Sequence, residues 1–369
     1  MESLGLGAFW RERRVLLTGH TGFKGAWLCL WLEKLGASAA TVALEPETSP
    51  SLYASLAPWP NSRHRVADIR DFLTLRSHVV AFQPEIVIHM AAQALVRRSY
   101  QDPLDTFSSN VMGTANVLEA ARACSSVKTV LVVTSDKVYA ESIDGAPFVE
   151  SDRLGGKDPY SASKACTEIV CDSYRASFFR EAGVRLATAR AGNVIGGGDW
   201  SPDRLVPDFI RAIESGEPIS LRYPNAIRPW QHVLEPLGAY LLYAQAISED
   251  RDSGTPDALN FGPHPESFAT VSEVAEALAA TYSVADAWVP APGPHPHESA
   301  TLKLSSALAQ RALGWQPRLS LQQALEWTAL WYKAYRDGMD MRAFTLAQIA
   351  DYEHRMQLTP KNELSHEPA

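Results

Sequence analysis

One short stretch of this sequence, TSDKVY at 134–139, holds a hydroxyl, an acid and a base next to one another. Ser135, Asp136 and Lys137 follow an apolar run that is typical of a buried strand. Asp136 and Lys137 could be a general acid and a general base acting on one substrate. They could equally be an ordinary solvated ion pair at the end of a strand. The neighbouring residues have to decide between these alternatives.

A second stretch, DPYSASK, adds a phenol and another lysine. Asp158 is a favoured N-cap and Pro159 a favoured first residue, so a helix is predicted to begin here. Tyr160 and Lys164 then lie one turn apart on the same face. A lysine ammonium lowers the pKa of a nearby phenol, which is about 10 when unperturbed. Such a phenol can take the proton of an alcohol while a nicotinamide cofactor oxidises the carbon, although exposed helices also carry tyrosine–lysine pairs.

A glycine-rich turn near the start of the chain could bind that cofactor. Gly19, Gly22 and Gly25 stand between the apolar run RVLLT and a stretch that is predicted to form an amphipathic helix. Glycines allow a tight turn and a close approach to a pyrophosphate, whose charge faces the helix N-terminus. The predicted cofactor contacts of this turn are the three glycines together with Thr21, Phe23 and Lys24.

The cofactor is predicted to be NAD rather than NADP. Glu45 lies 20 residues after Gly25, where a carboxylate can bind ribose hydroxyls, although a plain surface glutamate is the alternative. No arginine follows the second predicted strand before Arg63, so the usual clamp for a 2′-phosphate is absent. Topology predicts further cofactor contacts at Asp68, Ile69, Ala91, Ala92, Gln93 and Asn110, beside Tyr160 and Lys164.

Short apolar runs alternate with helical patterns through the first half of the chain. This alternation predicts an α/β fold, a Rossmann-like doubly wound parallel sheet whose ligands lie at the carboxyl ends of the strands. A smaller, mostly helical substrate-binding domain is predicted after about residue 198, where Pro and Trp become frequent. The predicted strands are 14–18, 39–44, 63–68 (the weakest), 84–92, 127–135 and 184–190, and the later helices are 234–248, 271–282, 305–313 and 320–336.

The predicted domains are discontinuous in sequence. Residues 10–198 and about 229–262 are assigned to the NAD-binding domain. About 199–228 and 263–357 are assigned to the substrate domain, and 358–369 to a polar tail.

Composition excludes several classes of protein. The chain has 369 residues, 46% of them hydrophobic, and a net charge of −8, which argues against a basic nucleic-acid-binding surface. No apolar run approaches the ~20 residues that span a bilayer, and no signal peptide is evident. The cysteines lack metal-ligand spacing and are interpreted as small buried residues, which indicates a cytoplasmic protein without a membrane partner. They are Cys29, Cys124, Cys166 and Cys171.

Taken together, the glycine turn, the strand–helix units and the tyrosine–lysine pair resemble the extended short-chain dehydrogenase/reductase superfamily, which includes the NAD-dependent epimerase/dehydratase family. Within it, sugar-nucleotide epimerases typically have a plain Ser or Thr where this chain has Ser-Asp-Lys, and dTDP-glucose dehydratases have Thr-Asp-Glu. Ser-Asp-Lys is similar to the CDP-glucose 4,6-dehydratases. The same resemblance is carried by GHTGFKGAWL (19–28), RAGNVIGGGDW (190–200), RPWQHVLEPL (228–237) and HPHE (295–298).

The resemblance implies an intramolecular redox dehydration in deoxysugar synthesis for surface polysaccharide. Tyr160 would take the O4 proton of the sugar beside Ser135, while NAD oxidises C4. The ketone acidifies the C5 proton, so Lys137 could remove it as base while Asp136 protonates the departing 6-hydroxyl. A base must be neutral, and burial together with nearby Lys164 is expected to lower the pKa of Lys137, whereas a close carboxylate raises it.

On the substrate side, diphosphate contacts are predicted at Asn193, Arg204 and Arg228, with surface ion pairs as the alternative for the arginines. Gln231 and His232 are included as orienting neighbours, and His297 and Glu298 of HPHE as nucleotide contacts. No metal is predicted, because the redox cycle needs none.

The resemblance also implies a homodimer or homotetramer through helices near 104–122 and 160–180. The alternative functions are a dehydratase of another nucleotide sugar, a 4-epimerase, or a non-catalytic NAD-binding sensor. The sensor is disfavoured because Tyr160, Lys164, Asp136 and Lys137 are all present.

Overall fold

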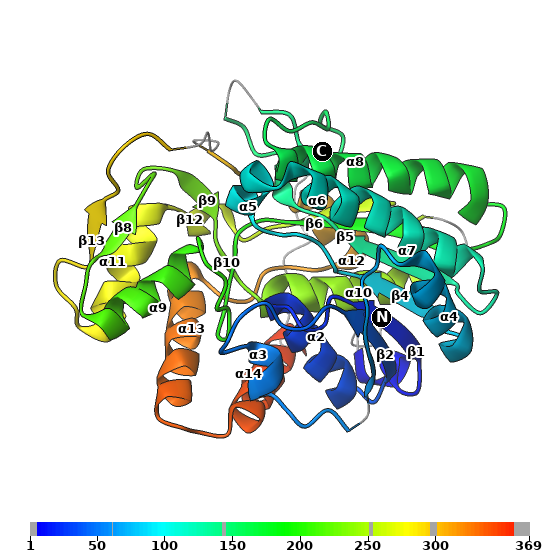
Figure 1. Ribbon diagram of the computed structural model, residues 1–369, viewed down its shortest axis with the longest axis horizontal. Coiled ribbons are helices and arrows are strands. Elements are labelled where there is room, and N and C mark those ends of the chain that lie inside the picture. The colour runs from blue at the N-terminus through cyan, green and yellow to red at the C-terminus, as the bar shows by residue number, and fades with distance from the viewer. Residues whose placement is uncertain (1–5, 61, 142–144, 251–253, 296–300, 358–369) are drawn as a thin grey trace, which may run out of the picture.

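The central feature of the structure, a computed structural model, is a seven-stranded parallel sheet in the order β11-β6-β5-β4-β1-β2-β3 (Figure 1). The structure describes residues 6–60, 62–141, 145–250, 254–295 and 301–357, so the predicted polar tail lies outside the described residues. The strands are β1 (Arg14–Thr18), β2 (Ser38–Ala43), β3 (Ser62–Val66), β4 (Ile86–His89), β5 (Thr129–Val133), β6 (Arg185–Ala191) and β11 (Ala258–Phe261).

The first six strands confirm the prediction of a Rossmann-like sheet, and each falls within or next to a predicted run. β11 was not predicted as a strand. It has only four residues, and it pairs with β6 across a long stretch of intervening chain. Nothing in a local apolar pattern indicates such a partner.

Alternate residues of the strands pack into different cores on the two faces of the sheet. Val15 and Leu17 of β1 belong to one core, and Leu16 to the other. This alternation follows from the two-residue repeat of a strand, and it explains why the runs are apolar throughout. One core includes α2 (Phe23–Lys34) and α10 (Leu234–Glu249), and the other includes α4 (Phe72–Phe82), α7 (Gly113–Arg122) and α8 (Pro159–Tyr174).

Helix α2 is not amphipathic as predicted, because it is buried from Gly25 to Leu32. The C-terminal helix α14 (Met341–Gln357) packs against it, and Trp31 Nε1 donates to Glu353 Oε1 at 2.7 Å. Helix α14 itself was not predicted, because Thr345 and Gln348 on its buried face are polar and interrupt the apolar pattern.

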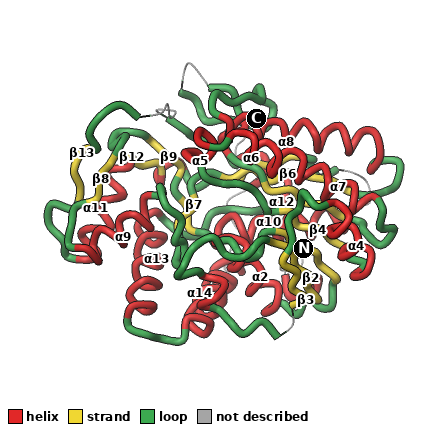
Figure 2. Tube along the Cα trace, in the orientation of Figure 1, coloured by secondary structure: helices red, strands yellow, loops and turns green. Residues whose placement is uncertain are grey.

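The remaining small sheets and several helices lie beyond the carboxyl ends of the large sheet (Figure 2). Helix α9 (Leu205–Ser215) was not among the predicted helices; Arg204 occupies its N-cap position. The small sheets pair β7 (Val194–Ile195) with β10 (Gln231–His232), β9 (Ile227–Pro229) with β12 (Phe268–Thr270), and β8 (Ile219–Leu221) with β13 (Trp288–Pro290).

The predicted later helices are confirmed as α10, α11 (Val271–Tyr282), α12 (Ala307–Leu313) and α13 (Leu321–Arg336). In the described part of the chain, no helix is both long and apolar enough to cross a membrane. The shorter helices are α1 (Leu6–Trp10), α3 (Leu52–Ser55), α5 (Val96–Gln101) and α6 (Pro103–Phe107), with single turns at Ser108–Met112, Asp136–Val138, Arg175–Phe179 and Pro265–Ser267.

Candidate active site

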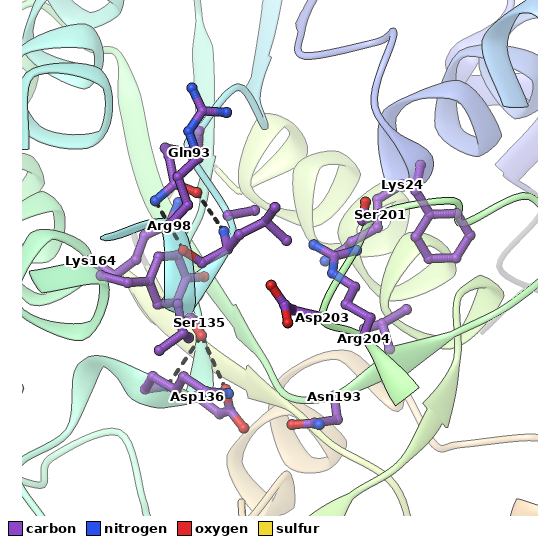
Figure 3. Close-up of a pocket in the computed structure, with 18 of the residues that line it drawn as sticks. Lys24, Gln93, Arg98, Ser135, Asp136, Lys164, Asn193, Ser201, Asp203 and Arg204 are labelled. Carbon is purple, nitrogen blue, oxygen red and sulfur yellow. Dashed lines mark hydrogen bonds and ion pairs between the residues drawn. The ribbon is translucent and has the colours of Figure 1, made fainter. Parts of the chain in front are cut away.

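A cavity of 1370 Å³ opens at the carboxyl ends of β1, β2, β4, β5 and β6. This is the edge at which doubly wound sheets bind ligands. The predicted site residues that line it are Gly19, Thr21, Gly22, Phe23, Lys24, Gly25, Glu45, Asp68, Ile69, Ala91, Ala92, Gln93, Ser135, Asp136, Lys137, Tyr160, Lys164, Asn193, Arg204 and Arg228. Figure 3 shows Ser135, Asp136 and Lys164 across the cavity from Lys24 and Arg204.

The glycine turn leaves room that a side chain would fill. Gly19 has φ +79, and a Cβ on it would lie 2.7 Å from Ala91 N. Helix α2 begins directly afterwards with Gly22 as N-cap and no side-chain cap, so its first N–H groups face the cavity without a side-chain acceptor. These features fit the diphosphate of a dinucleotide.

Lys24 of this turn lines the cavity. Its Nζ donates to Tyr240 Oη at 3.0 Å. Burial, together with the charges of Lys164 and Arg204, lowers the pKa of Lys24 to about 7. The side chain is therefore only partly charged at neutral pH.

Two of the predicted cofactor contacts that line the cavity, Glu45 and Asp68, are acidic. Glu45 lies exposed past the end of β2. Asp68 pairs with Arg70 (Nη2 to Oδ2, 2.6 Å), and the hydrogen bonds from Arg70 lower the pKa of that carboxyl. Its carboxylate is thus already engaged, whereas that of Glu45 faces the cavity from the position expected of a ribose ligand.

Asn110 lies behind the cavity wall, so its predicted contact with the cofactor is a correction. Its Oδ1 accepts from Gln93 N at 2.8 Å, and its Nδ2 donates to Gln93 O at 3.0 Å and to Ser163 Oγ at 2.8 Å. Asn110 therefore ties the loop after β4 to helix α8. It acts on the cavity through Gln93, which does line it.

Tyr160 and Lys164 lie on helix α8, which begins at the residues predicted from the sequence. The Asp158 side chain caps α8, and Pro159 is its first residue. Lys164 Nζ donates to Val133 O at 3.3 Å, and burial lowers the pKa of Lys164 to about 8. Burial also raises the pKa of Tyr160 to about 12, although a hydrogen bond with Ser135 opposes it. The expected lowering of the Tyr160 pKa is not seen, because burial outweighs the nearby charges.

The acid–base pair lies in the cavity wall rather than on the outer surface. Only 3% of the Asp136 side chain is exposed, against 26% for Lys137, and Asp136 Oδ1 lies 3.5 Å from Lys137 Nζ. Ser135 Oγ donates to the same oxygen at 3.0 Å. The buried Asp136 Oδ2 has no hydrogen-bond partner among the described residues. A solvated surface pair does not fit this burial.

Gly192 makes room for the Asp136 carboxylate. A Cβ on Gly192 would lie 2.8 Å from Asp136 Oδ2 and 2.6 Å from Pro229 Cγ. We expect Gly192→Ala to displace the carboxylate and to lower turnover by about 100-fold, at an overpacking cost of about 1–3 kcal/mol. Steady-state kinetics and thermal unfolding measure both effects. Gly254→Ala is the matched control, since no atom of the described residues lies within 4 Å of its added Cβ; equal turnover in both variants would contradict the prediction.

The three side chains predicted to contact the diphosphate line one part of the cavity, which we name the substrate half: Asn193, Arg204 and Arg228. Arg204 Nη1 pairs with Asp199 Oδ2 at 2.8 Å, and Arg228 is buried on β9. Asn193 Oδ1 is buried and has no hydrogen-bond partner in the described part of the chain. Two guanidinium groups and an amide suit a diphosphate.

Gln231 and His232, included as orienting neighbours of Arg228, do not line the described cavity. Gln231 Nε2 donates to Phe261 O at 2.9 Å. The ring of His232 packs edge-on against Trp27 and Trp327, and burial lowers its pKa to about 3. β10 turns both side chains into the core. His297 and Glu298 lie outside the described residues.

Sequence patterns missed an ion-pair bridge at the substrate half. Asp203 Oδ1 lies 2.9 Å from Arg97 Nη1 and 3.3 Å from Arg222 Nη1, and all three residues line the cavity. Asp203 has φ +63, a left-handed conformation for a non-glycine residue. The neighbouring Arg204 was predicted because it is basic, but only the tertiary structure brings α5 and β8 to Asp203.

Comparison with known proteins identifies the family. The sequence pattern of the NAD dependent epimerase/dehydratase family matches residues 15–262. The chain belongs to this family. It is therefore related to NAD-dependent enzymes over most of its length, in agreement with the predicted cofactor.

Individual members of the family are similar to this chain. CDP-glucose 4,6-dehydratase from Salmonella typhimurium is 43% identical over 349 residues, which cover 93% of this chain and 97% of the relative. The structure of Thermus thermophilus UDP-glucose 4-epimerase with NAD matches with a TM-score of 0.74 and 26% identity, over 86% of this chain and 97% of that one. A dTDP-glucose 4,6-dehydratase from Bacillus anthracis, solved with NAD, has a TM-score of 0.74 at 19% identity over 89% and 98% of the two chains, and it shows the shared fold.

Proposed function

We propose that this chain is a CDP-D-glucose 4,6-dehydratase, which forms CDP-4-dehydro-6-deoxy-D-glucose and water for deoxysugar and O-antigen polysaccharide synthesis. The observation that carries the proposal is the buried Asp136 beside Lys137 in the cavity wall, next to Ser135 and Tyr160. A 4-epimerase oxidises and reduces one carbon and needs no such pair. The Salmonella relative supports the choice of the CDP-sugar.

The side chains can divide the proton transfers among themselves. Tyr160, hydrogen-bonded to Ser135, accepts the proton from O4 of the hexose. NAD, when bound, would supply the oxidation of C4 and the later reduction of C6. Once C4 is a ketone the C5 proton is acidic, and Lys137 removes it. Asp136 donates a proton to the 6-hydroxyl, which leaves as water, and Lys137 returns its proton to C5 when C6 is reduced.

The substrate is proposed to bind beside the segments 199–228 and 263–357. Asn193, Arg204 and Arg228 would hold its diphosphate, and residues of 199–228 and 263–357 would form the sugar-nucleotide domain. Residues 10–198 with 229–262 would form the NAD-binding domain. The cytoplasm, where NAD and activated sugars are made, is the proposed location.

One assay tests the function. The purified protein is incubated with NAD and one nucleotide sugar at a time: CDP-, dTDP-, GDP- or UDP-glucose. The masses of the products are measured by mass spectrometry. We expect the CDP-sugar to lose one water and to gain a ketone. Loss of water from dTDP-glucose alone would replace the proposed substrate, and a product of unchanged mass would indicate a 4-epimerase.

Turnover is expected to fall as the pH rises through the pKa of Lys164. Burial lowers this pKa to about 8, so the ammonium that is proposed to bind the cofactor ribose and support the Tyr160 phenolate is lost above that pH. The decrease should approach tenfold per pH unit on the alkaline side. Turnover of Lys164→Arg, whose guanidinium stays charged, should lack this decrease. A wild-type profile that stays flat above about pH 9 would refute the assignment.

The proposed assembly is a homodimer, with a homotetramer as the alternative. Large apolar side chains are exposed on neighbouring elements: Leu104 (81%) of α6, Met112 (57%) after it, and Ile169 (58%) of α8. Burial of such side chains favours association. We expect Leu104→Glu combined with Ile169→Glu to give a monomer in light scattering. Leu330→Glu on the distant α13 is the control, and an unchanged mass of the double variant would contradict this interface.

A further inference from the structure

Three separate elements have to meet for the proposed dehydration. The end of β5 leads into Ser135, Asp136 and Lys137, helix α8 carries Tyr160 and Lys164, and β6 leads to the substrate half of the cavity. A buried carboxylate that has no part in the proposed proton transfers joins all three elements. It belongs to Glu168, one turn after Lys164 on α8, which is only 2% exposed.

Both carboxylate oxygens of Glu168 accept hydrogen bonds. Oε1 accepts from Thr134 Oγ1 of the segment after β5 at 2.5 Å. Oε2 accepts from Thr188 Oγ1 at 2.7 Å and from Arg190 Nη2 at 2.8 Å, and both donors belong to β6. Thr134 directly precedes Ser135, so a shift of Glu168 moves the start of the acid–base stretch.

Arg190 extends this network to the other end of the same stretch. Its Nη1 donates to Tyr139 Oη at 2.8 Å and to Glu150 O at 3.1 Å. Tyr139 in turn donates to Asn260 Oδ1 at 2.6 Å, and its ring stacks on Phe148. The stretch 134–139 is therefore held at both ends, by Glu168 directly and through Arg190.

The charge of Glu168 also acts on Lys164. Burial lowers the pKa of Lys164 to about 8, and Glu168 opposes this lowering. Among the described residues, other titratable side chains that interact with Lys164 include Lys24 of α2, His89 of β4 and Cys171 of α8. Among these groups, the carboxylate of Glu168 raises the pKa of Lys164 and so favours its ammonium form. Burial raises the pKa of the Cys171 thiol, which keeps that thiol neutral.

We propose that Glu168 is a positioning residue for the dehydration: through Thr134, Thr188 and Arg190 it holds α8 at a fixed distance from the acid–base stretch. This inference rests on the proposed function. Glu168 is not among the described residues that line the cavity, so it acts through Lys164, Thr134 and Arg190 rather than on the sugar.

The test uses Glu168→Gln, which keeps the shape and removes the charge. We expect kcat to fall by about 100-fold with little change in the KM for the nucleotide sugar, because the reacting groups are misplaced rather than removed. The alkaline limb of the pH profile should move to lower pH, since Lys164 loses a carboxylate neighbour that raises its pKa. A purely structural role would lower the folded fraction and leave that limb in place.

Two further variants separate charge from geometry. Glu168→Asp keeps the charge but shortens the side chain, so we expect a lower kcat with a pH profile closer to that of the wild type. Glu235→Gln is the matched control: Glu235 is another buried carboxylate, held by two backbone N–H groups and Tyr352 Oη away from the cavity. The Glu235→Gln substitution should lower the melting temperature without shifting the alkaline limb of the pH profile.

NADH binding, followed by fluorescence against pH, gives a readout that needs no turnover. The affinity of Glu168→Gln should decline at lower pH than that of the wild type. Wild-type kcat and an unmoved pH limb in folded Glu168→Gln would overturn the inference. If Glu168→Gln does not fold, a wild-type kcat in folded Thr188→Val, which removes one hydrogen bond to Oε2, would also overturn it. If the wild-type protein dehydrated none of the nucleotide sugars, the proposed function would be wrong. The pH dependence of NADH binding would still test the effect of Glu168 on Lys164.

Discussion

Replacing Lys137 with alanine is expected to stop the loss of water while C4 oxidation continues. Lys137 is the proposed base for the C5 proton, and its Nζ lies in the cavity wall beside the buried Asp136. Removing a general base typically costs 10²–10⁴-fold in rate, so product formation should fall by about that factor. Oxidation at C4 relies on Tyr160, which the substitution leaves intact. Mixing Lys137→Ala with CDP-glucose should therefore accumulate NADH, seen by its absorbance.

The control for this variant is Lys128→Ala. Lys128 is exposed before β5 and donates to Ser125 O, outside the described cavity lining. It should behave as the wild type in both the absorbance and the product assays. If Lys137→Ala turned over at the wild-type rate with saturating substrate, Lys137 would not be the base.

Replacing Tyr160 with phenylalanine is expected to block the earlier step. The phenol is buried in the cavity wall and hydrogen-bonded to Ser135, in the position to take the O4 proton. Its loss should lower product formation by about 10²–10⁴-fold, and no NADH should accumulate, because C4 is not oxidised. Rapid-mixing absorbance therefore distinguishes this variant from Lys137→Ala.

The matched control for Tyr160→Phe is Tyr174→Phe near the end of the same helix. Tyr174 packs against the core on the α4 and α7 face and does not line the described cavity. Its substitution should leave both assays unchanged. Accumulation of NADH by Tyr160→Phe would show that another group takes the O4 proton.

The sheet could be predicted from sequence wherever a strand is a continuous apolar run. In β1, the alternation of Val15, Leu16 and Leu17 between two cores makes the whole strand apolar, so the pattern is visible locally. β11 and α14 lack such a pattern. β11 is defined by its pairing with β6, and α14 by its contact with α2, which are both distant in the chain.

The site could be predicted where motif and structure share one local element. Tyr160 and Lys164 lie on one helix, and the glycine turn joins one strand to one helix. Asn110 was predicted as a cofactor contact but does not line the described cavity, because sequence spacing does not tell which face of an element meets the cavity. Asp203 was missed because its partners Arg97 and Arg222 come from remote segments. The network of Glu168 could not be predicted for the same reason.

The central claim, that one cavity both oxidises C4 and expels the 6-hydroxyl, is tested most directly with CDP-glucose that carries deuterium at C4. Mass spectrometry and NMR of the product locate the label. We predict a 4-keto-6-deoxy product with the deuterium at C6, because the bound cofactor returns it to the same sugar. A product that has lost water but carries no deuterium at C6, or a CDP-hexose of unchanged mass with the label still at C4, would contradict the account.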